Sequence, residues 1–270
     1  SVWIMRRQCS DILATGRQSA SAAWSANAST ELTRRRSGEA DVLLWYLFRA
    51  AGAEFDVDVP FAMVTDAFDD YLRSLDPSAI ARLATDRQGA LAVAFPSLQS
   101  IDAAVEYPVS AMERFRVHRA IAGLVERLAV RQPVVIVLDD LHWADIASLE
   151  LATYLTRHPP QAPVLIALGA RLGQGTPATI NVVNALVDSS NVEHIGLRPL
   201  TADAIGALVA GAGPAGSQSI FHLSGGNPFY ALQIARGGVW DVDPANVAGG
   251  PIPPPVARSI DAEVQRLSSP

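Results

Sequence analysis

The hydrophobic pattern divides the chain into alternating segments of strand and helix type. The strongest strand signal is Val134 to Leu138, a run of apolar residues that are nearly all β-branched. Further strands are predicted at Val164 to Leu168 and at Val192 to Leu197. The apolar run Val42 to Phe48 fits a strand buried on both faces, but its pattern does not exclude a helix, so both readings stay open.

Helical periodicity fills the intervals between these runs. From Pro60 to Leu75, apolar residues recur at spacings of three and four and form one stripe: Phe61, Val64, Ala67, Phe68, Tyr71, Leu72 and Leu75. Residues 112 to 130 repeat the pattern, and Pro133 ends it before the next strand. Further helices are expected near 146 to 157 and 178 to 187. Strands that alternate with helices predict an α/β domain with a parallel sheet and helices on both faces.

The second half of the chain changes character after Leu197, where the sheet is expected to end. Thr201 to Arg236 holds no strand candidate, which predicts a small all-helical subdomain whose first helix is capped by Thr201 and Asp203. A Pro- and Gly-rich linker follows, and then one amphipathic helix.

The start of the chain has a different composition, rich in Ser, Ala and Arg without a clean period of 2 or 3.6. Weak or non-native order is expected there. Together these patterns predict four segments: an atypical N-terminal segment at 1–39, the α/β core at 40–200, the helical subdomain at 201–248, and the linker with its helix at 249–270.

Composition narrows the classes of function. Among 270 residues, 49% are hydrophobic, which is enough for a sizeable core. The net charge of −6 argues against an electrostatic grip on DNA, RNA or an anionic membrane, so no DNA contact is expected from this chain. Cys9 is the single cysteine, which excludes an intrachain disulfide and suits a reducing cytoplasm, where we expect the protein. No run of about 18 uncharged apolar residues is present that could span a bilayer.

Two carboxylates follow the strongest predicted strand. Asp139 and Asp140 come directly after Val134 to Leu138, which places them at the carboxyl edge of a parallel sheet, where doubly wound folds bind ligands. This is the geometry of a Walker B motif. In that interpretation Asp139 helps to hold the water shell of a Mg²⁺ ion, and Asp140 orients the water that attacks the phosphate. In the alternative interpretation, the pair only caps a turn.

The segment that begins with this strand reads VVIVLDDLHWADIASLELATYL. It resembles the AAA-type ATPase domains of the STAND class, which occur in large LuxR-type transcriptional regulators and in multidomain proteins with nucleotide cyclase domains. The resemblance extends from about residue 50 to the end, through Asp56 to Phe61, Glu113 to Arg119, Leu197 to Leu200 and Ser224 to Phe229. It implies a P-loop NTPase-like fold with a helical lid, binding of ATP or ADP with Mg²⁺, and ATP hydrolysis.

Two further sites carry nucleotide contacts in the proteins that the chain resembles. Arg171 follows Val164 to Leu168, at the place of a sensor arginine that faces the γ-phosphate, although Gly169-Ala170 replaces the usual threonine and aromatic. The lid motif includes Asn227 and Pro228. Independently of the resemblance, Asn227 with Pro228 at the first helical position is a good helix start, whose free amides can face a phosphate. A plain helix-loop-helix corner uses the same residues.

His142 lies beside the two aspartates and suggests a third, weaker interpretation. A histidine near carboxylates can act as a general base, which would make the protein a hydrolase. No serine or cysteine nucleophile accompanies it in a recognisable motif. Packing of the loop after the strand is therefore the preferred role.

The phosphate-binding loop is missing from the chain. A P-loop requires Gly-x4-Gly-Lys-Ser/Thr, and all 21 basic residues of the Lys and Arg count are arginine. Thr15 to Ser19 and Gly38 to Ala40 offer only fragments of it. If the second fragment is aligned with the loop, Val42 to Phe48 becomes the following helix. Our hypothesis is that residues 1 to about 39 are a truncated, recombined or frame-shifted start.

These observations support two functions from different classes. The first is a truncated nucleotide-dependent switch module of a LuxR-type regulator, with Walker B retained, Walker A absent and hydrolysis lost, so that nucleotide binding is weak or none. The second is a catalytically dead interaction module or pseudogene remnant that binds a partner protein. Protein partners and self-association stay open in both.

Overall fold

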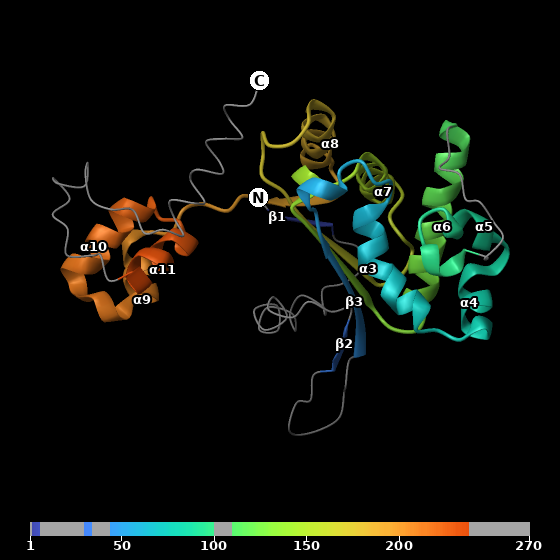
Figure 1. The fold of residues 1–270 in the computed structure, drawn as a ribbon, viewed down its shortest axis with the longest axis horizontal. Coiled ribbons are helices and arrows are strands. Elements are labelled where there is room, and N and C mark those ends of the chain that lie inside the picture. Colours follow the sequence, from blue (N-terminus) through green and yellow to red (C-terminus); the bar gives the residue numbers. More distant parts are fainter. Residues whose placement is uncertain (1, 6–29, 34–43, 100–109, 238–270) are drawn as a thin grey trace. The chain divides into compact units, whose positions relative to one another are not determined.

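A computed structural model describes residues 2–5, 30–33, 44–99 and 110–237 of the chain (Figure 1). The chain divides into two compact units at Gly196 and Leu197, and each is described by itself. The first unit contains a sheet with its helices. The second is helical in the part that the structure describes.

The first unit is built around a six-stranded sheet in the order β2-β3-β4-β5-β1-β6. The strands, in chain order, are β1 Val2–Met5, β2 Thr30–Thr33, β3 Leu44–Ala51, β4 Val134–Asp139, β5 Val164–Gly169 and β6 Val192–Ile195. The neighbours β3, β4 and β5 pair in parallel. These strands confirm the predicted parallel α/β core, and they show that the run from Val42 to Phe48 is a strand from Leu44 onward, so the helix reading is wrong there.

Two short strands depart from the parallel pattern. β1 lies between β5 and β6 and runs antiparallel to both, so β6 has the same direction as the central strands. β2 pairs antiparallel with β3. Both lie within residues 1–39, for which the sequence predicts weak or non-native order. Most of that segment, including Thr15 to Ser19 and Gly38 to Ala40, lies outside the described residues.

In the part of the chain that the structure describes, six helices lie on one side of the sheet: α3 Ala62–Arg73, α4 Pro77–Ala84, α5 Gln88–Ala92, α6 Ala111–Ala129, α7 Ile146–Arg157 and α8 Pro177–Val187. They share a single apolar core with alternate side chains of the central strands, such as Phe48, Ile136 and Ile166. Figure 1 shows α3, α4, α6 and α7 grouped to one side of β3.

The other face of the sheet has a smaller apolar cluster. Val135 and Leu165 are buried there against Trp45, Leu47 and Val137. None of the helices in the described part of the chain contributes to this cluster, whereas the sequence predicts helices on both faces. The helix positions predicted from periodicity agree with α3, α6, α7 and α8. Phe115, one of the apolar residues that repeat at helical spacing in 112 to 130, is an exception, because its side chain is exposed.

Local sequence explains where these helices begin. Ser110 and Glu113 form a reciprocal capping box at the start of α6. Asp76 and Thr176 cap α4 and α8, each followed by proline at the first helical position. Short 3-10 helices complete the chain path: η1 Glu54–Asp56, η2 Thr85–Arg87, η3 Pro96–Leu98, η4 Leu141–Trp143 and η5 Ala210–Ala212.

The second unit consists of α9 Ala202–Leu208, α10 Gly213–Ser224 and α11 Pro228–Gly237 in its described part. Its core is formed by Ile205, Val209, Ile220, Ala231 and Ile234. As predicted, Thr201 caps α9, because its hydroxyl accepts a hydrogen bond from the Ala204 amide at 3.3 Å. The linker and helix predicted at 249–270 lie outside the described residues. No helix in the part that the structure describes is long and apolar enough to cross a membrane.

Candidate nucleotide site

The end of β4 places Asp139 between the ends of two neighbouring strands. Asp139 is the last residue of β4 and pairs with Ala51 of β3, and its carbonyl oxygen accepts a hydrogen bond from the Gly52 amide at 3.0 Å. On the other side β5 ends at Gly169. The three parallel strands therefore bring Asp139 and the segments after β3 and β5 to one sheet edge, the carboxyl edge.

The Asp139 carboxylate is turned toward the backbone around it. Its Oδ1 atom accepts a hydrogen bond from the Asp140 amide at 2.9 Å. A Cβ atom built on Gly169 would overlap this same oxygen. Gly169 thus leaves the space in which the carboxylate lies, and a larger residue at this position would have to displace it.

Asp140 begins the loop that follows the strand. Its backbone is left-handed, with φ 52° and ψ 43°, a conformation that aspartate adopts more readily than most residues. Its side chain is 46% exposed, and its carbonyl oxygen accepts a hydrogen bond from the Trp143 amide at 2.8 Å. The turn fixes the backbone and leaves the carboxylate accessible to a ligand or a water molecule.

His142 lies beneath this loop rather than in solvent. Its side chain is only 3% exposed, and its Nε2 atom is 3.8 Å from Asp140 Oδ1. The imidazole ring packs near the Trp143 ring, with centroids 5.3 Å apart. A base for a hydrolytic reaction must reach the substrate, and this buried position favours the packing role instead.

Glycine backbones enclose the same loop. A Cβ atom on Gly52 would approach the Asp140 carbonyl oxygen to 2.6 Å and Trp143 Cβ to 3.0 Å. Gly175 has a φ of +100°, and a Cβ atom added to it would lie 2.6 Å from the His142 carbonyl oxygen. The loop from Asp139 to Trp143 is therefore held by close backbone contacts as well as by its own hydrogen bonds.

Asp145 has a structural role that its position in the sequence reveals only in part. Its carboxylate is buried and caps α7 by accepting hydrogen bonds from the Ser148 amide at 2.9 Å and the Ser148 hydroxyl at 2.5 Å. It also accepts from the amides of Phe61 at 2.7 Å and Met63 at 3.4 Å, across 84 and 82 residues of sequence. An aspartate just before a helical run signals the cap, but no local pattern reveals the second pair of contacts.

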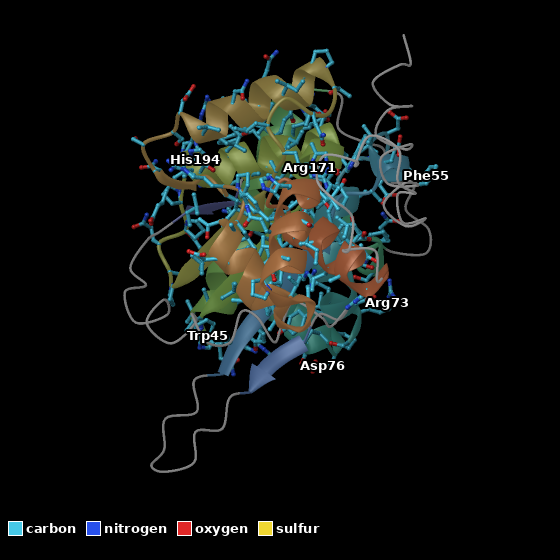
Figure 2. All side chains as sticks on the ribbon, turned by 90° about the vertical axis from the view of Figure 1, so that its left-hand side faces the viewer. Trp45, Phe55, Arg73, Asp76, Arg171 and His194 are labelled. Atoms are coloured by element: carbon cyan, nitrogen blue, oxygen red, sulfur yellow. The ribbon has the colours of Figure 1, made fainter. Side chains whose placement is uncertain are left out.

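Arg171 lies two residues beyond the end of β5 and is exposed. Because β4 and β5 are parallel neighbours, it lies at the carboxyl edge, on the same side of the sheet as Asp139 and Asp140. Phe55 follows the end of β3, and Trp45 lies near the start of the same strand. Figure 2 shows Arg171 at the same end of the first unit as Phe55, and Trp45 at the opposite end. The structure thus brings three of the predicted site residues to one edge.

Asn227 and Pro228 belong to the second unit, where they start α11. Gly225 and Gly226 both have positive φ, as expected at this helix end. Asn227 Oδ1 accepts hydrogen bonds from the amides of Phe229 at 2.9 Å and Tyr230 at 3.5 Å. The expectation that the first amides of this helix are free is therefore wrong, because the asparagine cap uses them. Whether Asn227 and Pro228 contact nucleotide stays a prediction.

Gly226 joins the two sequence motifs of the second unit. The Leu200 amide donates to the Gly226 carbonyl oxygen at 2.8 Å, and a Cβ atom on Gly226 would lie 2.5 Å from the Leu200 carbonyl oxygen. The segment Leu197 to Leu200 is thus held against the corner between α10 and α11. This close contact alone explains why a glycine is required at position 226, independently of any nucleotide.

The donor set suits magnesium in part. Mg²⁺ binds proteins through one or two carboxylates together with waters and substrate phosphates, and Asp139 and Asp140 supply the carboxylates. No group of three or more His, Cys, Asp and Glu side chains that could hold a metal by itself occurs among the described residues. A metal here would depend on phosphate oxygens, for which the chain has no P-loop lysine.

A parallel sheet covered by helices, with two carboxylates at its carboxyl edge, defines a P-loop NTPase-like α/β fold. The family model described as AAA ATPase domain matches residues 9–167, which is more than half of the chain. The protein belongs to this family. The match begins at residue 9, so the expectation that the resemblance starts near residue 50 is wrong.

A protein of Rhizobium meliloti (strain 1021), described as uncharacterized, is 24% identical over 139 residues. The aligned segment covers 48% of this chain and 13% of that relative, so the chain corresponds to a small part of a much longer protein. No solved structure matches the chain.

Proposed function

We propose that this chain is a nucleotide-responsive module of a multidomain STAND-type regulator of the LuxR kind, in which bound ADP or ATP biases a switch and hydrolysis is lost. The observation that carries the proposal is the position of Asp139 and Asp140 directly after β4. AAA ATPase domains generally bind ATP or ADP with Mg²⁺, and in doubly wound folds the ligand lies at this edge.

The edge residues suggest a division of roles. Asp139 would hold the water shell of Mg²⁺, and the exposed Asp140 carboxylate would face water near the γ-phosphate. Arg171, just beyond β5, would place its positive charge near the same phosphate. Burial of the His142 side chain supports a role in packing this loop.

Absence of lysine supports the loss of hydrolysis. Phosphoryl transfer relies on positioning and charge stabilisation of the β- and γ-phosphates, which the P-loop amides and lysine provide. None of the 270 residues is a lysine that could do this, since all 21 basic residues of the Lys and Arg count are arginine. Arginine is a planar fork and does not reproduce a compact ammonium inside such a loop. Weak nucleotide binding and negligible turnover follow.

The proposal that the chain belongs to a LuxR-type regulator is supported by the resemblance of its motifs and by the length of its relative. The segment after β4 and the lid motif at Ser224 to Phe229 resemble LuxR-type regulators, and the Rhizobium meliloti relative is a much longer protein. The net charge of −6 supports DNA contact by other parts of such a regulator rather than by this chain.

A catalytically dead interaction module is the second candidate, and the same absence of lysine favours it. The two candidates differ in nucleotide binding. In the first, nucleotide stabilises the folded chain through the Asp139 edge. In the second, it has no effect, and a partner protein is the ligand.

Thermal unfolding in the presence of Mg-ADP or Mg-ATP tests the proposal. We expect a rise in the unfolding midpoint that grows with nucleotide concentration and needs Mg²⁺, because a ligand that binds only the folded state stabilises it. Asp139→Ala should abolish the rise, and Asp188→Ala, which removes an exposed carboxylate at the end of α8, should keep it. An unchanged midpoint at all concentrations would reject the switch in favour of the interaction module.

A further inference from the structure

Two arginine side chains meet over a glycine in the middle of α6. A Cβ atom built on Gly123 would lie 3.0 Å from Arg127 Nη1 and 3.1 Å from Arg87 Nη1. Both guanidinium groups therefore approach the same point of the helix surface and are close neighbours. Glycine inside a helix costs about 1 kcal/mol relative to alanine, so this position gives up helix stability where it provides room for the two groups.

Each guanidinium is held in place by a backbone carbonyl group. Arg87 Nη1 donates to the Arg119 carbonyl oxygen at 3.1 Å, within α6. Arg127 Nε donates to the Leu83 carbonyl oxygen in the last turn of α4. Arg87 and its acceptor are 32 residues apart in the chain, and Arg127 and its acceptor are 44 residues apart. Both side chains are thus held by contacts between separate elements. The arrangement is ordered before any ligand arrives.

The positive charges of the pair lack a direct counter-charge. Among the residues that the structure describes, no carboxylate lies within 4.0 Å of either guanidinium group. The nearby carboxylates are engaged elsewhere: Asp86 accepts from the Thr85 hydroxyl at 3.0 Å, and Glu126 accepts from the Gln161 amide at 3.0 Å. Two like charges held together without a partner repel each other and favour an anion between them.

The lack of a partner is clearest for the guanidinium group of Arg127. Its Nη2 atom is buried and has no hydrogen-bond partner in the described part of the chain. Burial and the neighbouring Arg87 lower the pKa of Arg127, although Glu126 and Asp86 act in the opposite direction. A buried donor without an acceptor costs free energy, so the protein itself satisfies the Arg127 guanidinium incompletely.

The arginine pair is separate from the nucleotide edge. α6 ends at Ala129 and leads into the start of β4 at Val134, whereas Asp139 and Asp140 follow the end of β4. The contact of Glu126 with Gln161, just before β5, also places this part of α6 near the starts of the strands. Arg127 therefore lies toward the edge of the sheet opposite to Asp139.

We propose that Arg87 and Arg127, lying over Gly123, form a binding site for a phosphate-type oxyanion. Two guanidinium groups offer several N–H donors in fixed planes and two positive charges, which match the charge and the acceptor oxygens of a phosphate group at neutral pH. A carboxylate would balance only one of the two charges. The competing explanation is that the two side chains only cap backbone carbonyl groups of α4 and α6.

Titration of the full chain with inorganic phosphate at constant ionic strength, followed by amide NMR shifts, tests the proposal. We expect saturable shifts around Gly123, weaker binding of acetate, and a loss of about tenfold in phosphate affinity in Arg87→Gln, since one charge-assisted contact is removed. Arg157→Gln removes an exposed arginine on α7 and should leave the affinity unchanged. Absence of saturable shifts, equal affinity in Arg87→Gln, or acetate binding as tightly as phosphate would overturn the site.

Gly123→Ala provides an independent geometric test. The new methyl group would displace the Nη1 atoms of Arg87 and Arg127 by a few tenths of an ångström from their fixed positions, which should lower phosphate affinity. Alanine is the better helix former, so the thermal unfolding midpoint should stay the same or rise. Loss of phosphate binding in a variant that is at least as stable supports the site, and unchanged affinity in that variant contradicts it.

Discussion

Single glycines set the geometry at the end of β4. Gly52 and Gly169 stand at the ends of the two neighbouring strands, and each is in contact with one residue of the aspartate pair. The loop after β4 can lie between them because neither has a side chain. The glycine at position 169, where the resemblance implies a threonine, therefore has a local steric explanation.

Gly169→Ala should destabilise the protein by about 1–3 kcal/mol, because the added Cβ atom overlaps the Asp139 carboxylate within a packed sheet. Urea unfolding measures the change. Gly89→Ala is the matched control, since no atom lies within 4 Å of its new methyl group in α5 and helix propensity favours alanine by up to ~1 kcal/mol. Equal stability of the two variants would show that the Asp139 carboxylate moves away without cost.

Asp145→Ala should cost more stability than Asp76→Ala, although both aspartates cap a helix. Asp76 is exposed, and loss of such a cap costs roughly 1 kcal/mol. Asp145 is buried and also accepts from the Phe61 amide, so its loss leaves buried donors without a partner and should cost about 3 kcal/mol. Chemical unfolding of both variants measures the difference, and a larger loss in Asp76→Ala would refute the assigned role of Asp145.

At the scale of elements, α6 contains a buried histidine that makes stability depend on pH. His118 packs between Phe61 and Tyr154, and burial, assisted by Arg114, lowers its pKa from 6.5 to about 4. The unfolded chain therefore binds a proton at a higher pH than the folded chain does. The contribution of His118 to stability is full above pH 6.5 and should be lost as the pH decreases from 6.5 toward 4.

His118→Phe keeps the ring and removes the titration, so the variant should lose stability less steeply across this pH range. Urea midpoints of wild type and variant, measured at several pH values, give the two slopes. Identical slopes would mean that His118 is protonated in the folded protein as easily as in the unfolded one.

Elements with a clear period could be predicted from the sequence, and those that depend on distant pairing could not. The apolar stripe of α3 and the β-branched run of β4 carry their own signals, and both lie where the sequence predicts them. β1 has no such signal, because its place between β5 and β6 depends on pairing partners more than 160 residues away in the chain. The helix or strand ambiguity at Leu44 is likewise resolved only by pairing of this segment with β4.

The residues of the candidate site likewise divide into those that a local sequence signal places and those that depend on distant contacts. Asp139, Asp140 and Arg171 could be placed from strand ends, since parallel neighbours bring their carboxyl ends to one edge. The cap at Asn227 and the double role of Asp145 depend on hydrogen bonds that residue type does not specify. The space over Gly123 was not predictable either, because it arises from two arginines on separate elements.

At the scale of the whole molecule, the two units differ in the size of their cores. Among the residues that the structure describes, the first unit buries a large cluster that includes Ile121, whereas the second buries a cluster of five residues that includes Ile220. A smaller core gives lower stability. We therefore expect the second unit to open at a lower free energy than the first.

Ile220→Ala and Ile121→Ala each remove a fully buried isoleucine side chain, which costs about 2–5 kcal/mol at such sites. Amide hydrogen exchange should show faster exchange confined to α9, α10 and α11 in Ile220→Ala, and in the first unit in Ile121→Ala. Uniform acceleration throughout the chain in both variants would instead indicate that the two units unfold as one.

We propose that the carboxyl edge of this AAA ATPase domain retains a nucleotide contact through Asp139 without a phosphate-binding loop. Calorimetric titration of the chain with Mg-ATP, in parallel with Asp139→Ala and Asp188→Ala, tests it directly. We expect weak saturable binding that Asp139→Ala removes and Asp188→Ala preserves. Binding of equal strength in Asp139→Ala, or no heat of binding up to millimolar nucleotide, would contradict it.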